Sequence, residues 1–100
     1  DGALIITADE ADSPKADASA CCGEGPAPNA ALPGITGLGG GRVGALVLSR
    51  FVAPGTTSTQ DYNHYFLLAS TEDLFGLPYL GYAAQEGLPR FGADVWTGSW

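Results

Sequence analysis

The chain has 100 residues and a net charge of −7, because eleven acidic residues outnumber four basic ones. That balance excludes a nucleic-acid partner, which needs a basic face, and polybasic attachment to an anionic membrane. The longest apolar run, residues 44–49, is far too short to form a transmembrane segment. One hundred residues make one small domain at most. Since the chain has no methionine and starts abruptly, we expect a single partial domain, 1–100, cut from a longer protein.

Residues 4–7 form a short apolar run rich in β-branched residues, which predicts a strand buried on both faces of an α/β sheet. Asp9 and Glu10 follow it directly, at the strand end where open α/β sheets place their ligand sites. Carboxylate oxygens there suit a divalent cation, and a cation suits phosphate chemistry. A solvated turn is the alternative for such a pair, and the pair alone does not decide between them.

The only two cysteines, Cys21 and Cys22, are adjacent. Neighbouring cysteines rarely bridge one another, because the eight-membered ring strains the peptide. Free thiols are one interpretation, but we expect disulfides to cysteines outside the chain, which implies an oxidising, extracytoplasmic compartment. A metal site is disfavoured because no CxxC or Cys/His spacing accompanies the pair.

Residues 11–41 are rich in small and polar residues without a sustained period, which predicts a long loop. Residues 43–49 predict a second buried strand, and residues 64–75 a helix with Asp61 or Asn63 as its N-cap. Gly76 and Pro78 end that helix. Its apolar face comprises Leu67, Leu68, Thr71, Leu74 and Phe75. We therefore expect an α/β fold with two parallel strands, one helix, long loops and an irregular tail packed by its aromatic residues.

Gly39, Gly41 and Gly44 satisfy the GxGxxG pattern, but they precede a strand instead of joining a strand to a helix. A dinucleotide site is therefore not expected, and the glycines predict a turn that lets the backbone pass close to another segment. The acidic run Asp9, Glu10, Asp12 and Asp17 lacks the Asp/Asn alternation, the sixth-position glycine and the closing glutamate of a calcium loop. No GxSxG elbow surrounds Ser49, so a hydrolase triad with His64 is unsupported.

Four residues remain as candidates for chemistry: Asp9 and Glu10 as metal ligands, with Arg42 and His64 as catalytic residues. Taken singly, each of these four residues has a simpler explanation. A lone arginine is usually a surface charge, and a lone histidine at a helix start usually makes a local hydrogen bond.

The segments that hold these residues are ITADEAD, ACCGEGPAPN, GGGRVGALVLS and PGTTSTQDYNHYFLLASTEDLFGLPYLGYA. In this order they resemble the C-terminal part of bacterial phosphoesterases, the acid phosphatase and phospholipase C-like proteins of the alkaline phosphatase superfamily. Among these, the chain looks closest to secreted phosphatases described as phosphatidylinositol-3-phosphatase-like. The resemblance covers residues 4–96 and implies an α/β/α sandwich, bound metal and a Ser or Thr nucleophile that forms a phosphoenzyme.

The resemblance also implies roles for individual residues. The family's T-x-D-E block, which supplies metal-binding carboxylates, matches residues 7–10, and its G-R-V block matches residues 41–43. Its N-H-Y-S-L-L-R block matches residues 63–69, with Phe66 in place of Ser and Ala69 in place of Arg; Arg50 stands where a Pro usually follows the strand. The family's Glu-Asn metal block and its nucleophile have no counterpart in these 100 residues.

We therefore expect the C-terminal fragment of a secreted, metal-dependent phosphoesterase, inactive by itself and completed by the N-terminal remainder of the same protein. Its cofactor would be Ca²⁺, Mg²⁺ or Mn²⁺, and its substrate a phosphate ester, with phosphoinositides among the candidates. Two alternatives stay open: a small acidic module that binds a cation or a protein without catalysis, and a degenerate, inactive remnant of the enzyme.

Overall fold

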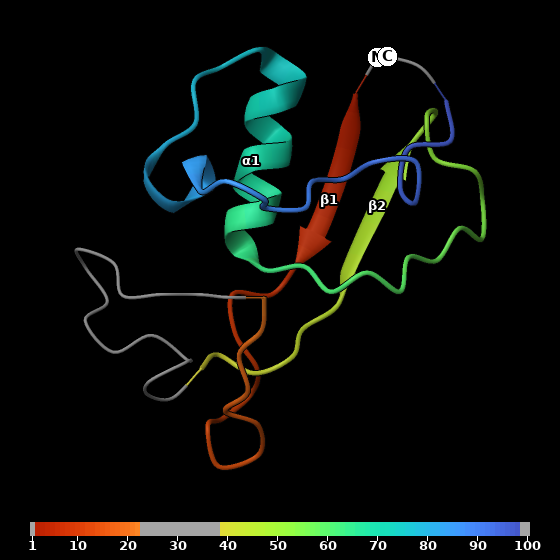
Figure 1. Cartoon of the computed structure of the whole chain (residues 1–100). Coiled ribbons are helices and arrows are strands. Elements are labelled where there is room, and N and C mark those ends of the chain that lie inside the picture. Colours follow the sequence, from red (N-terminus) through yellow and green to blue (C-terminus); the bar gives the residue numbers. More distant parts are fainter. Residues whose placement is uncertain (1, 23–38, 99–100) are drawn as a thin grey trace. The chain divides into compact units, whose positions relative to one another are not determined.

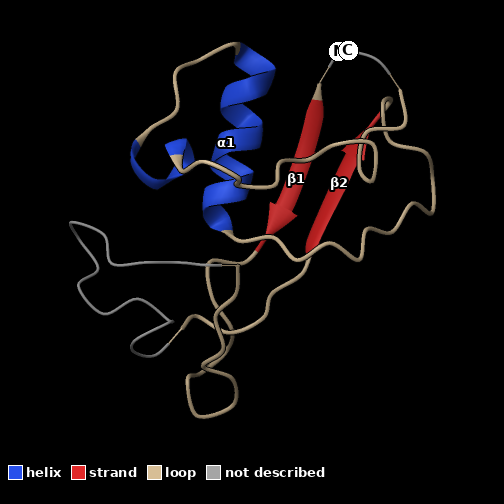
Figure 2. Ribbon diagram, viewed as in Figure 1, coloured by secondary structure: helices blue, strands red, loops and turns tan. Residues whose placement is uncertain are grey.

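A computed structural model describes residues 2–22 and 39–98 of the chain (Figure 1). In chain order its elements are the strands β1 (Ala3–Thr7) and β2 (Ala45–Ser49), the helix α1 (His64–Phe75) and the 3₁₀ helix η1 (Gly81–Ala84). The fold is therefore mixed α/β (Figure 2). The chain divides into two compact units, Asp1–Arg50 with both strands and Phe51–Trp100 with both helices, and each is described by itself. Neither helix has the length and apolar character that crossing a membrane requires within residues 2–22 and 39–98.

β1 and β2 pair in antiparallel fashion, and the prediction of parallel strands is wrong (Figure 1). Thr7 lies opposite Ala45, and Ala3 opposite Ser49. A parallel pair needs a crossover that carries the chain back to the starting end of the first strand. Here β2 starts beside the end of β1, so no such crossover is made. Residues 8–22 and 39–44, the described part of the connection, hold no helix, and residues 23–38 of the predicted loop lie outside the described residues.

The strands are more exposed than predicted. Leu4 pairs with Leu48 and Ile6 with Leu46, and these four side chains share one face of the sheet. Each is between 50% and 56% exposed. The prediction that both strands are buried on both faces is therefore wrong for the described residues. Continuous apolar runs are typical of strands that are buried on both faces of a sheet. Such a run does not show which residues cover those faces.

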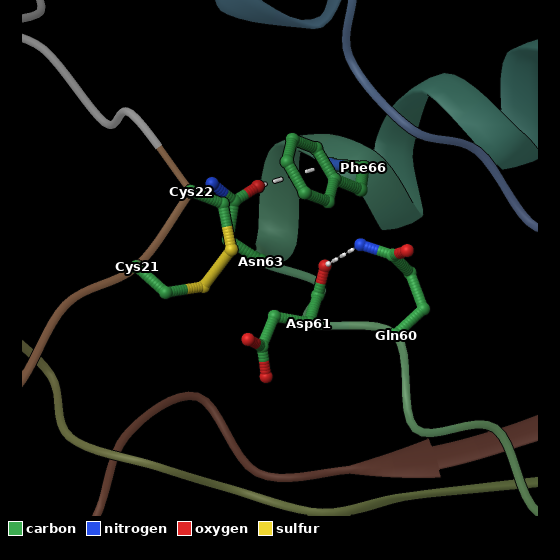
Figure 3. Close-up of a disulfide and its surroundings, with 6 residues drawn as sticks. All are labelled: Cys21, Cys22, Gln60, Asp61, Asn63 and Phe66. Carbon is green, nitrogen blue, oxygen red and sulfur yellow. Dashed lines mark hydrogen bonds between the residues drawn. A yellow bond between two sulfur atoms is a disulfide. The ribbon is translucent and has the colours of Figure 1, made fainter.

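The helix follows its sequence signals closely. α1 spans the predicted residues, and the side chain of Asn63 accepts a hydrogen bond from the Phe66 N–H at 3.1 Å (Figure 3). Asn63 is therefore the N-cap, which decides between the two predicted candidates. Gly76 ends the helix with a φ of 62°. This left-handed conformation suits glycine, as predicted from its position.

The buried face of α1 differs from the predicted one. Leu68, Leu74 and Phe75 are exposed, whereas the buried helix residues are Phe66, Ala69, Ser70 and Glu72. The apolar periodicity pointed to the wrong face because two polar residues are buried through hydrogen bonds to the backbone of the tail. The hydroxyl of Ser70 accepts the Phe91 N–H at 2.9 Å, and the carboxylate of Glu72 accepts the Leu80 N–H at 3.0 Å.

The tail after α1 is irregular and packed by aromatic residues, as predicted. Edge-to-face contacts join the ring of Phe91 to those of Tyr62 and Trp96, at centroid distances of 5.0 and 6.1 Å. The core of this unit combines buried residues of α1 with residues of the tail: Phe66, Ala69, Ala83, Leu88 and Val95. The tail is thus part of the hydrophobic core of its unit.

Candidate functional site

The two predicted metal ligands lie at the exposed end of β1. Asp9 and Glu10 follow the strand by two and three residues, and both are exposed. Asp9 Oδ1 accepts the Glu10 N–H at 3.0 Å, which shapes the turn that carries both carboxylates. The hydroxyl of Thr7 donates to the carbonyl of Gly44 at 2.8 Å and ties this end of β1 to the lead-in of β2.

The glycine turn of residues 39–42 runs beside these carboxylates. The Ala11 N–H donates to the Gly40 carbonyl at 2.7 Å, immediately after Glu10. A Cβ built at Gly40 would lie 3.4 Å from the Cβ of Glu10. The turn and the carboxylate pair, some thirty residues apart in the sequence, are therefore neighbours in the first unit.

Close backbone approach explains the glycines of this turn. A Cβ at Gly39 would lie 2.1 Å from the carbonyl oxygen of Ser19, a distance that no side chain allows. Gly41 has a φ of 77°, and its Cβ would lie 2.6 Å from that of Ala11. The prediction that these glycines let the backbone pass close to another segment is confirmed for both positions. Gly44, by contrast, has open space around it.

Asp17 holds the end of the glycine turn. Its Oδ2 accepts the Arg42 N–H at 2.8 Å, and its Oδ1 accepts the Ser19 N–H at 2.9 Å. Hydrogen bonds from the Ser19 hydroxyl and from the backbone of Arg42 and Ser19, with the Arg42 charge, lower the pKa of Asp17 from 3.8 to about 2. The sequence had suggested this residue only as part of a rejected calcium loop. Nothing in the sequence spacing of Asp17 and Arg42 predicts that they are in contact.

Asp9, Glu10 and Arg42 thus all belong to the described part of the first unit, and all three are exposed. Arg42 is held through its backbone, which leaves its guanidinium at the surface beside the glycine turn. No group of three or more His, Cys, Asp or Glu side chains that could hold a metal occurs within residues 2–22 and 39–98. Asp9 and Glu10 offer hard oxygen donors of the kind that Mg²⁺, Mn²⁺ and Ca²⁺ prefer, but only as part of a coordination shell.

His64 is the first residue of α1 in the second unit, and it is exposed. Its position is set by Asn63, because the N-cap fixes where the helix begins. The Phe66 and Ala69 positions, where the chain departs from the phosphoesterase pattern, are 1% and 0% exposed. These two residues therefore serve packing in the core of the second unit.

The two cysteines bond to each other, so the prediction of disulfides to outside cysteines is wrong (Figure 3). Neither is free. The eight-membered ring closes with Cys22 in a left-handed backbone, at a φ of 69°.

The second unit contains a polar cluster that the sequence did not suggest. Asp94 Oδ2 accepts hydrogen bonds from the hydroxyls of Ser58 and Tyr62, the latter at 2.6 Å. Burial and the Asp94 hydrogen bond raise the pKa of Tyr62 from 10.0 to about 12. Burial alone would raise the pKa of Asp94, but the hydroxyl hydrogen bonds outweigh it and hold this pKa below its usual value.

A hollow of about 520 Å³ opens beside this cluster, lined by residues 57–60, Tyr62, Arg90 and Asp94 among others. Its charged groups already have partners within the unit. Arg90 pairs with Asp73 at 2.8 Å, and Asp94 accepts the two hydroxyls. The cluster therefore fastens the segment before α1 to the tail.

In the first unit, the segment with the two exposed carboxylates lies beside the close-packed glycine turn that ends at Arg42. Comparisons of the chain with protein-family models, with curated proteins and with solved structures found no match.

Proposed function

We propose that the chain is part of a metal-dependent phosphoesterase and that Asp9 and Glu10 contribute ligands to its divalent cation. The observation that carries the proposal is the hydrogen bond from the Ala11 N–H to the Gly40 carbonyl. It joins the residue directly after the segment that matches the family's T-x-D-E block, residues 7–10, to the residue directly before the segment that matches its G-R-V block, residues 41–43. These segments are far apart in the sequence, and an active site built from both requires them to be neighbours.

In this proposal a bound cation neutralises phosphate charge at the carboxylate turn. Arg42, exposed at the end of the glycine turn, binds the phosphate oxygens of the substrate, for which a guanidinium fork is well suited. His64, the other predicted catalytic residue, lies in the second unit and stays a prediction from the sequence. The remaining ligands and the Ser or Thr nucleophile come from a segment outside these 100 residues, which also extends the sheet towards an α/β/α sandwich.

The same proposal places the protein outside the cytoplasm. Disulfides persist in oxidising compartments and are rare among cytosolic proteins. The oxidised state of Cys21 and Cys22 is consistent with a secreted or periplasmic enzyme.

The replacements at Phe66 and Ala69 are consistent with the second alternative, a degenerate remnant. Both side chains are buried, so they are explained by packing of the second unit and need not reflect the loss of catalytic groups. A cation-binding module without catalysis remains the competing function, and the experiment below separates it from the enzyme.

The test begins with the reading frame upstream of Asp1. A Glu-Asn block and a Ser or Thr nucleophile there support the enzyme, whereas a start codon immediately before Asp1 overturns it. In the full-length protein, Asp9→Asn should abolish metal-dependent phosphate release from a phosphomonoester. Asp12→Asn, which removes an exposed carboxylate from the same segment, is the matched control and should retain activity.

Wild-type turnover in Asp9→Asn would show that the carboxylate assignment is wrong. If the full-length wild-type protein binds Mn²⁺ without any phosphate release, the binding module replaces the enzyme as its function.

A further inference from the structure

The Cys21–Cys22 bond is not explained as a stabiliser of the fold. A disulfide constrains the unfolded chain more as it closes a longer loop, and a bond between neighbours closes the shortest loop there is. Its effect is local, because it fixes the backbone of two residues and removes two thiols from the surface. Cys22 is exposed and Cys21 is half-buried, so a small reagent can reach the bond.

The backbone at this bond depends on the bond itself. Cys22, with its φ of 69°, is the only residue other than glycine with a positive φ within residues 2–22 and 39–98. A residue with a Cβ seldom adopts this conformation unless its surroundings impose it. The eight-membered ring imposes it here, so opening the ring allows Cys22 to return to a negative φ.

The segment just before Cys21 is hydrogen-bonded to the glycine turn, so a change in the backbone at Cys22 acts on that turn. Two and three residues before Cys21, the carbonyls of Ser19 and Ala18 accept the N–H groups of Gly41 and Gly39, at 3.0 and 2.9 Å. This short ladder holds the turn that ends at Arg42. A rearrangement of the backbone after Ser19 therefore acts on the hydrogen bonds that position the turn.

We propose that Cys21–Cys22 is a reversible two-electron redox site that locks the glycine turn when oxidised and releases it when reduced. The reductant is a small dithiol. One of its thiolates attacks Sγ of Cys22, forms a mixed disulfide and displaces the Cys21 thiolate, which takes up a proton. The second thiol of the reductant then displaces Cys22 as a thiol, and the reductant leaves as a cyclic disulfide. This proposal does not depend on the phosphoesterase function.

The redox chemistry is tested by mass spectrometry on the intact 100-residue chain. Treatment with dithiothreitol should raise the mass by about 2 Da, and removal of the reductant in air should reverse the change. Phenylarsine oxide should bind only the reduced chain, one arsenic per chain, by condensing with both thiols and releasing one water. Alkylation of both cysteines without reductant, or a reduced chain that does not reoxidise to the same bond, would overturn the proposal.

The structural effect is tested by amide hydrogen exchange of Gly39 and Gly41. Reduction should speed the exchange of both amides by about tenfold, while the amides of the β1–β2 ladder, as internal reference, keep their rates. Unchanged exchange of Gly39 and Gly41 in the reduced chain would show that the bond does not control the turn.

Two double variants separate the bond from the thiols. Cys21→Ser with Cys22→Ser should exchange as the reduced chain does, with or without reductant. Cys21→Ser with Cys22→Gly should retain the slower exchange of the oxidised chain, because glycine adopts the left-handed backbone without a ring. Equal exchange in the two variants would contradict the role assigned to the Cys22 backbone.

Discussion

The carboxylate of Asp17 accepts the backbone N–H of Arg42 at 2.8 Å, across a sequence separation of 25 residues. The same carboxylate accepts the Ser19 N–H through its other oxygen. One side chain therefore shapes its own turn and fixes the end of the glycine turn. The backbone of Arg42, the candidate phosphate ligand, is therefore held by a residue that takes no part in the proposed chemistry.

The first prediction concerns the pH dependence of this contact. Folding lowers the pKa of Asp17 to about 2, so its contribution to stability is present above 3.8 and is lost as the pH falls through about 2. The rate of amide hydrogen exchange of Arg42 and Ser19, corrected for intrinsic rates, should rise as the pH falls from 3.8 to about 2. Asp17→Asn keeps a single acceptor oxygen for two donors, so at every pH at least one of the Arg42 and Ser19 amides should exchange fast. Asp12→Asn is the control, and a wild-type pH profile in Asp17→Asn would contradict the assignment.

The second prediction concerns the glycine turn. Gly41→Ala must place a Cβ 2.6 Å from that of Ala11 at a φ of 77°. The left-handed backbone alone costs about 1–2 kcal/mol, and the overlap adds to it. Thermal unfolding, followed through the NMR chemical shifts of residues in β1 and β2, should show this loss of stability. Gly44→Ala, at an open position with ordinary φ, should unfold within about 0.5 kcal/mol of wild type. Equal stability of the two variants would argue against the close approach.

How far the sequence predicts this molecule depends on the range of the interaction concerned. The bounds of α1 and its end at Gly76 follow from signals within a few residues and were predicted, and Asn63 was one of two predicted candidates for its N-cap. The direction of β2 relative to β1 depends on how a long connection returns, about which an apolar run says nothing. The role of Asp17 could not be predicted for a similar reason, because its partner lies 25 residues away.

Burial on α1 shows a second limit of sequence patterns. Apolar periodicity assumes that the core side of a helix is apolar, but this helix buries Ser70 and Glu72. Both residues accept backbone N–H groups from a tail without regular structure. The backbone N–H groups of such a tail need side chains as hydrogen-bond acceptors. No local sequence pattern predicts which side chains these are.

The third prediction tests the polar cluster of the second unit. A spectrophotometric titration should show Tyr62 with a pKa of about 12, and the hydrogen bond to Asp73 should raise the pKa of Tyr79 as well. Asp94→Asn removes the carboxylate that accepts the Tyr62 hydroxyl, so the pKa of Tyr62 should fall towards its ordinary value. Because folding raises the Tyr62 pKa, its contribution is present below pH 10 and is lost as the pH rises through about 12. A titration unchanged by Asp94→Asn would contradict this assignment.

The fourth prediction compares two neighbouring hydroxyls on α1. Ser70 donates to the Phe66 carbonyl and accepts the Phe91 N–H, whereas Thr71 donates to the Leu67 carbonyl. Ser70→Ala leaves the Phe91 amide without its acceptor and should cost about 1–3 kcal/mol of unfolding free energy. Thr71→Ala removes only a bond back into the helix and should change stability by about 0.5 kcal/mol or less. Urea unfolding followed by helix circular dichroism measures both, and similar losses would contradict the bridging role of Ser70.

The last prediction concerns Glu72, which is 3% exposed. Its Oε1 accepts the Leu80 N–H at 3.0 Å, while its buried Oε2 has no hydrogen-bond partner. Glu72→Gln keeps an acceptor for Leu80 and removes a charge that is costly to bury, so its stability should equal or exceed that of wild type. Glu72→Ala removes the acceptor as well and should lose about 1–3 kcal/mol of unfolding free energy. If both variants lose stability equally, the charge itself is required, and a cationic group must approach Oε2 in the folded protein.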